Sequence, residues 1–177
     1  MKKIITLLFI SAITLTSCSD DGEMGPQGPP GEDGINIVGQ TYETPAVNFE
    51  YIEATNYYSS LITIPGDIEI IPSDAILVYR LEVLEDEGGQ FDAWSLIPQN
   101  FFLEEGIIQY VYNHTDGDVE IIIDGNFDLS NLESGFTQNQ IFRFVIIPSD
   151  QALDPSVNVA DFNAVMQSLG LNESDIK

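Results

Sequence analysis

Carboxylates are the most abundant side chains in this sequence that could take part in catalysis in pairs. The 177 residues include 29 Asp and Glu, 5 Lys and Arg, and a single His. Two carboxylates that flank a sugar can hydrolyse a glycosidic bond if burial keeps one of them protonated as the acid. The candidate groups are Glu104-Glu105 and Glu85-Asp86-Glu87. Both have the composition of solvated loop ends, so the sequence favours a protein that is not an enzyme, with a glycan hydrolase as the alternative.

The single histidine, His114, offers little nucleophilic chemistry. A Ser-His-Asp triad would have to use it, but it stands beside a predicted hairpin turn and no Gly-x-Ser-x-Gly sequence accompanies it. The sequence also lacks an H-E-x-x-H zinc motif, a Walker loop and the G-x-G-x-x-G of dinucleotide-binding folds. With one cysteine in the chain, a dithiol is absent as well. These absences exclude a flavin- or nicotinamide-dependent oxidoreductase.

Asp124, Asn126 and Asp128 form a D-x-N-x-D pattern of oxygen-bearing side chains, a spacing with which a loop can coordinate calcium. The pattern departs from an EF-hand, because Leu129 stands where that loop requires glycine and Gly135 where it requires a bidentate glutamate. We therefore expect no cofactor, with a weak surface Ca²⁺ site at these three residues as the alternative to a solvated turn.

Two arginines are candidate ligand-binding residues. Arg80 and Arg143 each interrupt an apolar strand candidate. Pairing with a carboxylate on the sheet is the ordinary structural role of such a residue, and Arg80 shares a predicted strand face with Glu82. Recognition of a ligand carboxylate or a sugar acid is the functional alternative.

Aromatic side chains are a second kind of candidate ligand surface. Trp94, Tyr57-Tyr58 and Phe101-Phe102 could together form a platform on which a glycan stacks. Aromatic side chains in a β domain more often pack in the core. The sequence leaves both roles open for Trp94.

These candidate residues fall within a β-rich region that begins at Ile35, where the composition shifts to Ile, Val, Tyr and Phe. Runs of these residues alternate with Gly, Pro, Asn and Asp, and Asp116-Gly117 is a favoured hairpin turn. The predicted strands cover residues 36–41, 47–54, 60–64, 75–84, 93–97, 107–113, 119–124 and 140–147. We expect a mainly β domain over residues 35–177, built as an antiparallel sandwich or an open barrel.

One C-terminal helix is predicted near residues 159–169. Asn158 is the expected N-cap, with Asp161 three residues later and Gly170 as the stop. The apolar residues at helical spacing are Phe162, Val165, Met166 and Leu169. We expect this apolar stripe to dock on the sheet rather than to bind a partner.

Residues 1–17 have the order of a bacterial signal peptide. Two lysines precede an apolar run over residues 4–13, which is too short to span a bilayer because a span needs about 20 residues. The segment ends in Leu15-Thr16-Ser17-Cys18, which resembles the lipobox of bacterial lipoproteins. That resemblance implies cleavage before Cys18 and attachment of lipid to its thiol. An ordinary secreted protein with one unpaired cysteine is the alternative.

A short acidic segment follows the cysteine directly. It reads Ser19, Asp20, Asp21, Gly22, Glu23. The segment is similar to the Ser-Asp-Asp-rich tag that directs lipoproteins of Bacteroidetes-type bacteria to the outer face of the outer membrane. The alternative is a solvated acidic spacer.

Glycine then recurs at every third position, as Gly22, Gly25, Gly28, Gly31 and Gly34. A collagen triple helix requires this period because glycine alone fits its axis, and prolines preset the backbone. Residues 18–34 therefore combine the acidic tag with a short collagen-like stalk. The stalk is either a stiff monomeric spacer or, with help from the domain that follows, part of a homotrimer.

The order of lipobox, acidic tag, G-x-y stalk and β domain resembles the collagen-like surface lipoproteins of Bacteroidetes-type bacteria. The resemblance implies a membrane-anchored protein on the extracellular side of the outer membrane. It implies no activity, and no functional residues beyond Cys18 and the tag. We expect a binding or structural domain whose partner is a glycan or an envelope protein. The mature chain keeps three bases against 29 acids, a formal charge of −26, which excludes nucleic-acid binding.

Overall fold

The structure is a computed structural model that describes residues 39–149, 151 and 153–177. All of these residues belong to one compact unit. Cys18, the acidic tag and the G-x-y stalk lie outside the described residues, so the expectations for them stay predictions.

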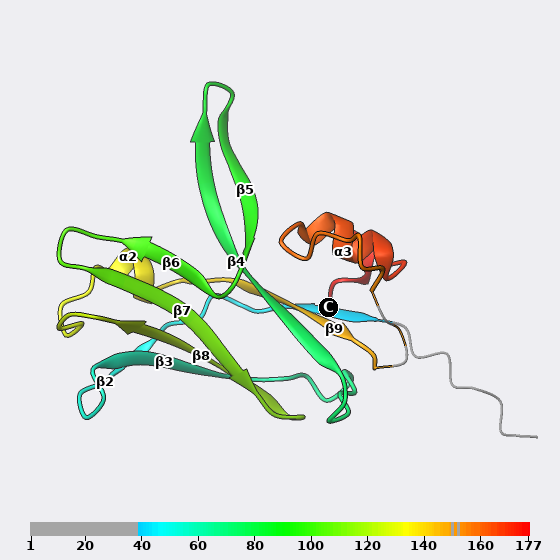
Figure 1. The fold of residues 1–177 in the computed structure, drawn as a ribbon, viewed down its shortest axis with the longest axis horizontal. Helices are drawn as coiled ribbons and strands as arrows, with labels where there is room; N and C mark the ends of the chain where they lie inside the picture. The colour runs from blue at the N-terminus through cyan, green and yellow to red at the C-terminus, as the bar shows by residue number, and fades with distance from the viewer. Residues whose placement is uncertain (1–38, 150, 152) are drawn as a thin grey trace, which may run out of the picture. The chain divides into compact units, whose positions relative to one another are not determined.

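The described residues form two antiparallel sheets that do not close into a barrel (Figure 1). The four-stranded sheet has the order β1-β9-β4-β5, and the five-stranded sheet has the order β2-β3-β8-β7-β6. The strands are β1 Gln40–Glu43, β2 Glu50–Ile52, β3 Tyr57–Thr63, β4 Ala75–Asp86, β5 Gly89–Leu96, β6 Gln99–Phe102, β7 Ile107–His114, β8 Asp118–Gly125 and β9 Phe142–Ile147. The mainly β, antiparallel, sandwich-like fold predicted from the sequence is confirmed.

Each of the eight predicted strands overlaps an observed strand, and β6 is the strand that the sequence does not predict. Proline ends a strand because it lacks the N–H that the ladder needs, and Pro98 therefore indicates an ending after Ile97. The chain instead passes from β5 in one sheet to β6 in the other across these two residues. The proline marks a change of sheet rather than the start of a loop.

The main core lies between the two sheets. Alternate residues of β3, β4, β7, β8 and β9 point into it, as expected where successive side chains take opposite faces. Val78 of β4, Ile121 of β8 and Phe142 of β9 are fully buried there. The strands are therefore held mainly by apolar burial between the sheets.

Helix α3 (Phe162–Ser168) covers the outer face of the four-stranded sheet. Phe162 and Val165 of the helix pack against Tyr79 of β4 and Val145 of β9 in a second buried cluster. Strand β9 is thus buried on both faces, which explains why it is a nearly continuous run of apolar residues. The prediction that the apolar stripe docks on the sheet is confirmed.

The predicted N-cap of α3 is wrong by three residues. Asp161 is the cap, and its side chain accepts a hydrogen bond from the backbone N–H of Ala164. Asn158 accepts one from the N–H of Ala160 in the preceding turn, a role for which Asn is equally suited. Gly170 follows the helix with a φ of 72°, as expected of a helix stop. None of the helices in the described residues is long and apolar enough to cross a membrane.

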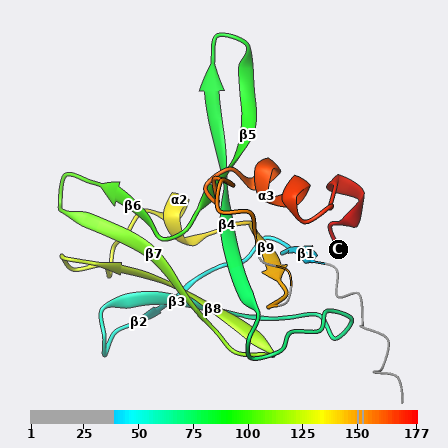
Figure 2. The same cartoon turned by 45° about the vertical axis from the view of Figure 1, so that its right-hand side comes forward.

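The two ends of the sandwich differ. The register pairs Gln40, near the point where the chain enters the sheet, with Ile146 at the far end of β9. The short helix α2 (Ser134–Thr137) precedes the other end of β9 and lies beside the β6–β7 loop (Figures 1 and 2). The β6–β7 loop and α2 therefore lie at the end opposite to the point of entry.

Candidate functional site

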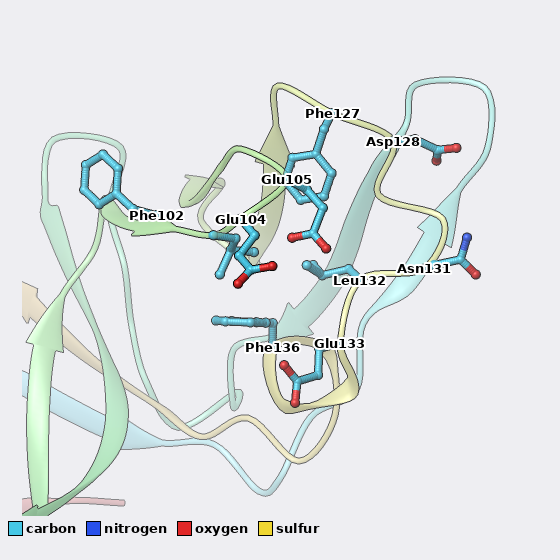
Figure 3. Close-up of a pocket in the computed structure, with 10 residues that line it drawn as sticks. Phe102, Glu104, Glu105, Phe127, Asp128, Asn131, Leu132, Glu133 and Phe136 are labelled. Atoms are coloured by element: carbon cyan, nitrogen blue, oxygen red, sulfur yellow. The ribbon is translucent and has the colours of Figure 1, made fainter.

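A cleft lies at this second end, between the β6–β7 loop and the segment that leads from β8 through α2 (Figure 3). We call it the acidic cleft, and its volume is about 510 Å³. Its lining residues are Phe102, Leu103, Glu104, Glu105, Phe127, Asp128, Asn131, Leu132, Glu133 and Phe136. Four carboxylates and three phenylalanines thus share one cleft.

The β6–β7 loop is held close to the end of β8 by a glycine. Gly106 has a φ of 156°, and a Cβ at this position would lie 2.2 Å from Oδ1 of Asn126. That oxygen needs the space because it accepts a hydrogen bond of 2.8 Å from the N–H of Ile107. The loop closes where the N–H of Leu103 donates to the carbonyl of Gly106 at 2.7 Å. The two glutamates between these residues therefore stand on a tight turn.

The opposite wall is held by Asn56, which lies just before β3. Its Nδ2 donates to the carbonyl of Phe127 at 2.7 Å, and its Oδ1 accepts from the N–H of Leu129 at 2.8 Å. Asn56 has a φ of 54°, a conformation that Asn tolerates better than most residues. Leu129 is fully buried. The amide therefore fixes the start of this wall to the sheet beneath it.

Phe136 of α2 forms the apolar floor of the acidic cleft. Its ring packs on Phe101, with a centroid distance of 5.3 Å. Its carbonyl accepts a hydrogen bond of 2.5 Å from the hydroxyl of Tyr110. Burial raises the pKa of Tyr110 to about 12, so the hydroxyl stays protonated and can donate at neutral pH. The floor is therefore anchored to the core of the sandwich.

The carboxylates of the cleft come from both walls. Figure 3 shows Glu104 and Glu105 extending from the β6–β7 loop toward Leu132 and Phe136, whereas Asp128 points away from them. Both glutamates are exposed. The backbone N–H and the side chain of Ser130 hold the pKa of Asp128 below its usual range. No Lys or Arg lines the cleft, so its field favours neutral or positively charged ligands.

The structure places one predicted carboxylate pair in this cleft and the other elsewhere. Glu104-Glu105 lines it, whereas Glu85-Asp86-Glu87 lies at the tip of the β4–β5 hairpin. The sequence gives no signal for Glu133 or Phe136, because they are far along the chain from the loop that they face. The pairing of β7 with β8 brings the two segments together.

The three residues of the predicted calcium site use their oxygens to shape the turn after β8. Oδ1 of Asp124 accepts from the N–H of Gly125, and Oδ1 of Asp128 accepts from the N–H of Ser130. Oδ1 of Asn126 is bonded to the β6–β7 loop as described above. The described residues contain no group of three or more His, Cys, Asp or Glu that could hold a metal ion. Calcium binding at these residues stays a prediction.

Arg80 lies on the inner face of the four-stranded sheet and is 8% exposed. Its Nε donates to Oε1 of Gln140 at 2.8 Å, and its Nη1 lies 3.4 Å from Oε1 of Glu82, the partner expected from the sequence. The guanidinium also stacks over the rings of Tyr110 and Phe101, at 4.8 and 5.3 Å from their centroids. Its bonds serve the packing between the two sheets.

Arg143 lies on the outer face of the same sheet, beneath α3. Its Nε is 2.8 Å from Oε2 of Glu43, its register partner on β1, and Nη1 and Nη2 each lie 3.3 Å from Glu173. The guanidinium stacks on Trp94 at 4.0 Å and on Phe162 at 4.9 Å. Arg143 therefore joins strands β1, β5 and β9 to the C-terminal helical segment, which includes η1 (Glu173–Asp175).

The structure does not gather the predicted ligand-binding side chains into one site. Arg80 and Arg143 lie on opposite faces of one sheet, and Trp94 accompanies Arg143 beneath the helix. Phe101 packs against the core, whereas the neighbouring Phe102 is 80% exposed at the acidic cleft. Of these five residues, Phe102 is the one that borders the cleft.

Comparison with family models, with curated proteins and with solved structures finds no match to this chain.

Proposed function

We propose that this protein is a lipid-anchored lipoprotein of the outer membrane that displays a β-sandwich domain on the cell surface and binds a ligand there without turning it over. The lipobox at Cys18, the acidic tag and the G-x-y stalk support the anchor and the display. The first described strand, β1, begins at Gln40.

The observation that carries the binding proposal is the acidic cleft at the opposite end of the sandwich. The cleft combines aromatic rings, which stack on sugars, with carboxylates, which accept hydrogen bonds from hydroxyl or ammonium groups. The ligand class that fits best is a neutral or amino-sugar glycan, because the negative field repels uronic acids and phosphates.

Membrane attachment is tested with Cys18→Ala. The variant is expected to move from the membrane fraction to the soluble fraction and to lose labelling by a radioactive or clickable fatty acid, because the thiol is the only site for the lipid. Protease treatment of intact cells adds a test of display. Retention of the acyl label by the variant would refute the anchor, and protection of the domain from external protease would refute surface display.

Ligand binding is tested with the full chain on immobilised oligosaccharides. Neutral and amino-sugar oligomers are expected to bind, and oligomers of uronic acids serve as the charged control. The double variant Glu104→Gln with Glu133→Gln should weaken binding about tenfold or more, since bonds to a charged group contribute about 1.5–3 kcal/mol. Glu87→Gln, on the distant hairpin tip, is the matched control and should bind normally. Equal binding by both variants would exclude the acidic cleft.

A glycan hydrolase is the second candidate, favoured by one observation: Glu104, Glu105 and Glu133 line the same cleft from two segments. The three residues are exposed, whereas glycosidases usually bury the carboxyl that acts as the acid. Release of reducing ends from the oligosaccharides that bind would establish the enzyme. Binding without release supports the non-enzymatic proposal.

A further inference from the structure

The β4–β5 hairpin projects beyond the rest of the four-stranded sheet (Figures 1 and 2). Strand β4 pairs with β9 over Ala75–Arg80, and its remaining residues to Asp86 pair with β5 alone. The residues that precede β9 turn away from β4, because Asn139 has a φ of 54° and Gln140 forms a bridge with Val47 instead. The outer half of β4 thus has one open edge.

The open edge of β4 offers unpaired hydrogen-bonding groups to another strand. The N–H of Leu81 makes the last bond to the β9 side, where it donates to Ile141. Because successive residues of a strand alternate in direction, the N–H and C=O groups of Val83 and Glu85 point to that same side. No described strand pairs with them there. Such an edge is a template for an added strand.

A groove of about 300 Å³ runs beside this open edge. Residues 80–84 of β4 form one wall, and Phe101 with residues 139–141 forms the other. The hairpin also presents apolar side chains on both of its faces, since Val83 is 57% and Leu84 42% exposed. An extended chain in this groove could pair with the edge and cover apolar surface at the same time.

The negative charge of the hairpin indicates what kind of strand can bind at the open edge. Residues 81–92 contain five acids and no base, and of the five only Glu82 makes an ion pair within the described residues. A second copy of this hairpin would bring like charges together along the edge, which opposes pairing between copies. A basic strand would meet complementary charges.

We propose that the open edge of β4 beyond Arg80 docks an extended, basic segment of a partner protein by strand addition. The interaction is separate from the acidic cleft, which lies at the end of the sandwich. The partner's backbone pairs with Val83 and Glu85, and its lysine or arginine side chains face the hairpin acids.

The test uses the full chain and a fluorescent peptide in which lysine and valine alternate. The peptide should bind, and binding should weaken in high salt, because the Debye length falls from about 8 Å at 0.15 M to about 3 Å at 1 M. A peptide in which glutamate replaces lysine should not bind. Absence of binding by the lysine peptide would overturn the proposal.

Two proline variants locate the docking edge. Val83→Pro removes an N–H on the open edge of β4, and Gln90→Pro makes the same change on the outer edge of β5. Val83→Pro should weaken binding about tenfold or more, and Gln90→Pro should leave it unchanged. The opposite result, or equal binding by both variants and the wild type, would overturn the proposal.

Charge reversal gives a test that does not depend on proline. Glu85→Lys, an exposed substitution, should weaken binding of the lysine peptide about tenfold with an unchanged circular dichroism spectrum. The double variant Glu104→Gln with Glu133→Gln should bind it normally, and loss of binding there would place the peptide in the acidic cleft instead. A wild-type dimer in sedimentation that Val83→Pro abolishes would identify a second copy as the occupant and refute the basic partner.

Discussion

Arg143→Met tests whether this arginine is part of the architecture or is held for a ligand. The side chain is 11% exposed, and its guanidinium lies 4.0 Å from the centroid of Trp94. A largely desolvated cation–π contact is worth about 1–2 kcal/mol. The Glu43 contact at 2.8 Å adds about 1 kcal/mol after discounting for the 38% exposure of that glutamate.

The contact with Glu173 contributes little, because that carboxylate is 71% exposed. Methionine keeps the apolar packing of the arginine stem, so the expected loss is about 2–3 kcal/mol of unfolding free energy. The midpoint of thermal unfolding should fall by roughly 5–10 °C. Arg143→Lys should lose less, since it keeps the charge but not the planar group that stacks and bonds.

Trp94 is the only tryptophan of the chain and touches the perturbed group, so urea unfolding followed by its fluorescence reports on this site. Circular dichroism of the backbone serves as the global probe. Lys177→Met is the matched control, because it removes the same charge from an exposed pair with Asp67 and should change the unfolding free energy little. A loss in Arg143→Met as small as that of the control would refute the structural role and favour a ligand for Arg143.

The remaining predictions concern the walls of the acidic cleft. Gly106→Ala should lower the free energy of unfolding, measured in urea, by roughly 1–3 kcal/mol, because the new Cβ displaces Asn126 from its bond to the loop. Gly117→Ala is the control and should lower it little, because the space around Gly117 is open. Tyr110→Phe should cost about 1 kcal/mol at pH 7 through the lost bond to Phe136. Because burial raises the pKa of Tyr110 to about 12, its contribution is complete below pH 10 and is lost as the pH rises to 12. The variant should therefore lose about 2–3 kcal/mol less than the wild type over that interval, and parallel losses in the two proteins would contradict this.

Much of the fold could be predicted because the strands follow simple patterns. The β7–β8 hairpin shows this best, since the turn at Asp116-Gly117 and the flanking β-formers indicate both strands and their pairing. Strand β6 could not be predicted, because proline usually ends a strand. The shift of the α3 cap from Asn158 to Asp161 has a similar cause, since both residues suit a cap and tertiary packing decides between them.

The acidic cleft could be predicted only in part. The sequence marks Glu104-Glu105 as an acidic group, but it gives no sign that Glu133 and Phe136 stand opposite. That arrangement depends on Asn56, which ties the far wall to β3 through bonds to Phe127 and a neighbouring residue. A site assembled by long-range hydrogen bonds leaves no local pattern in the chain.

The positions of the basic residues indicate which charge a ligand of this domain can carry. The three bases among the described residues, Arg80, Arg143 and Lys177, are each paired with a carboxylate, so none is left to attract an anion. The two arginines are committed to packing on either face of one sheet. The field outside the domain is therefore set by acids alone. The ligands proposed for the two sites agree with this negative field. The acidic cleft suits neutral or amino sugars, and the open edge of β4 suits a basic strand.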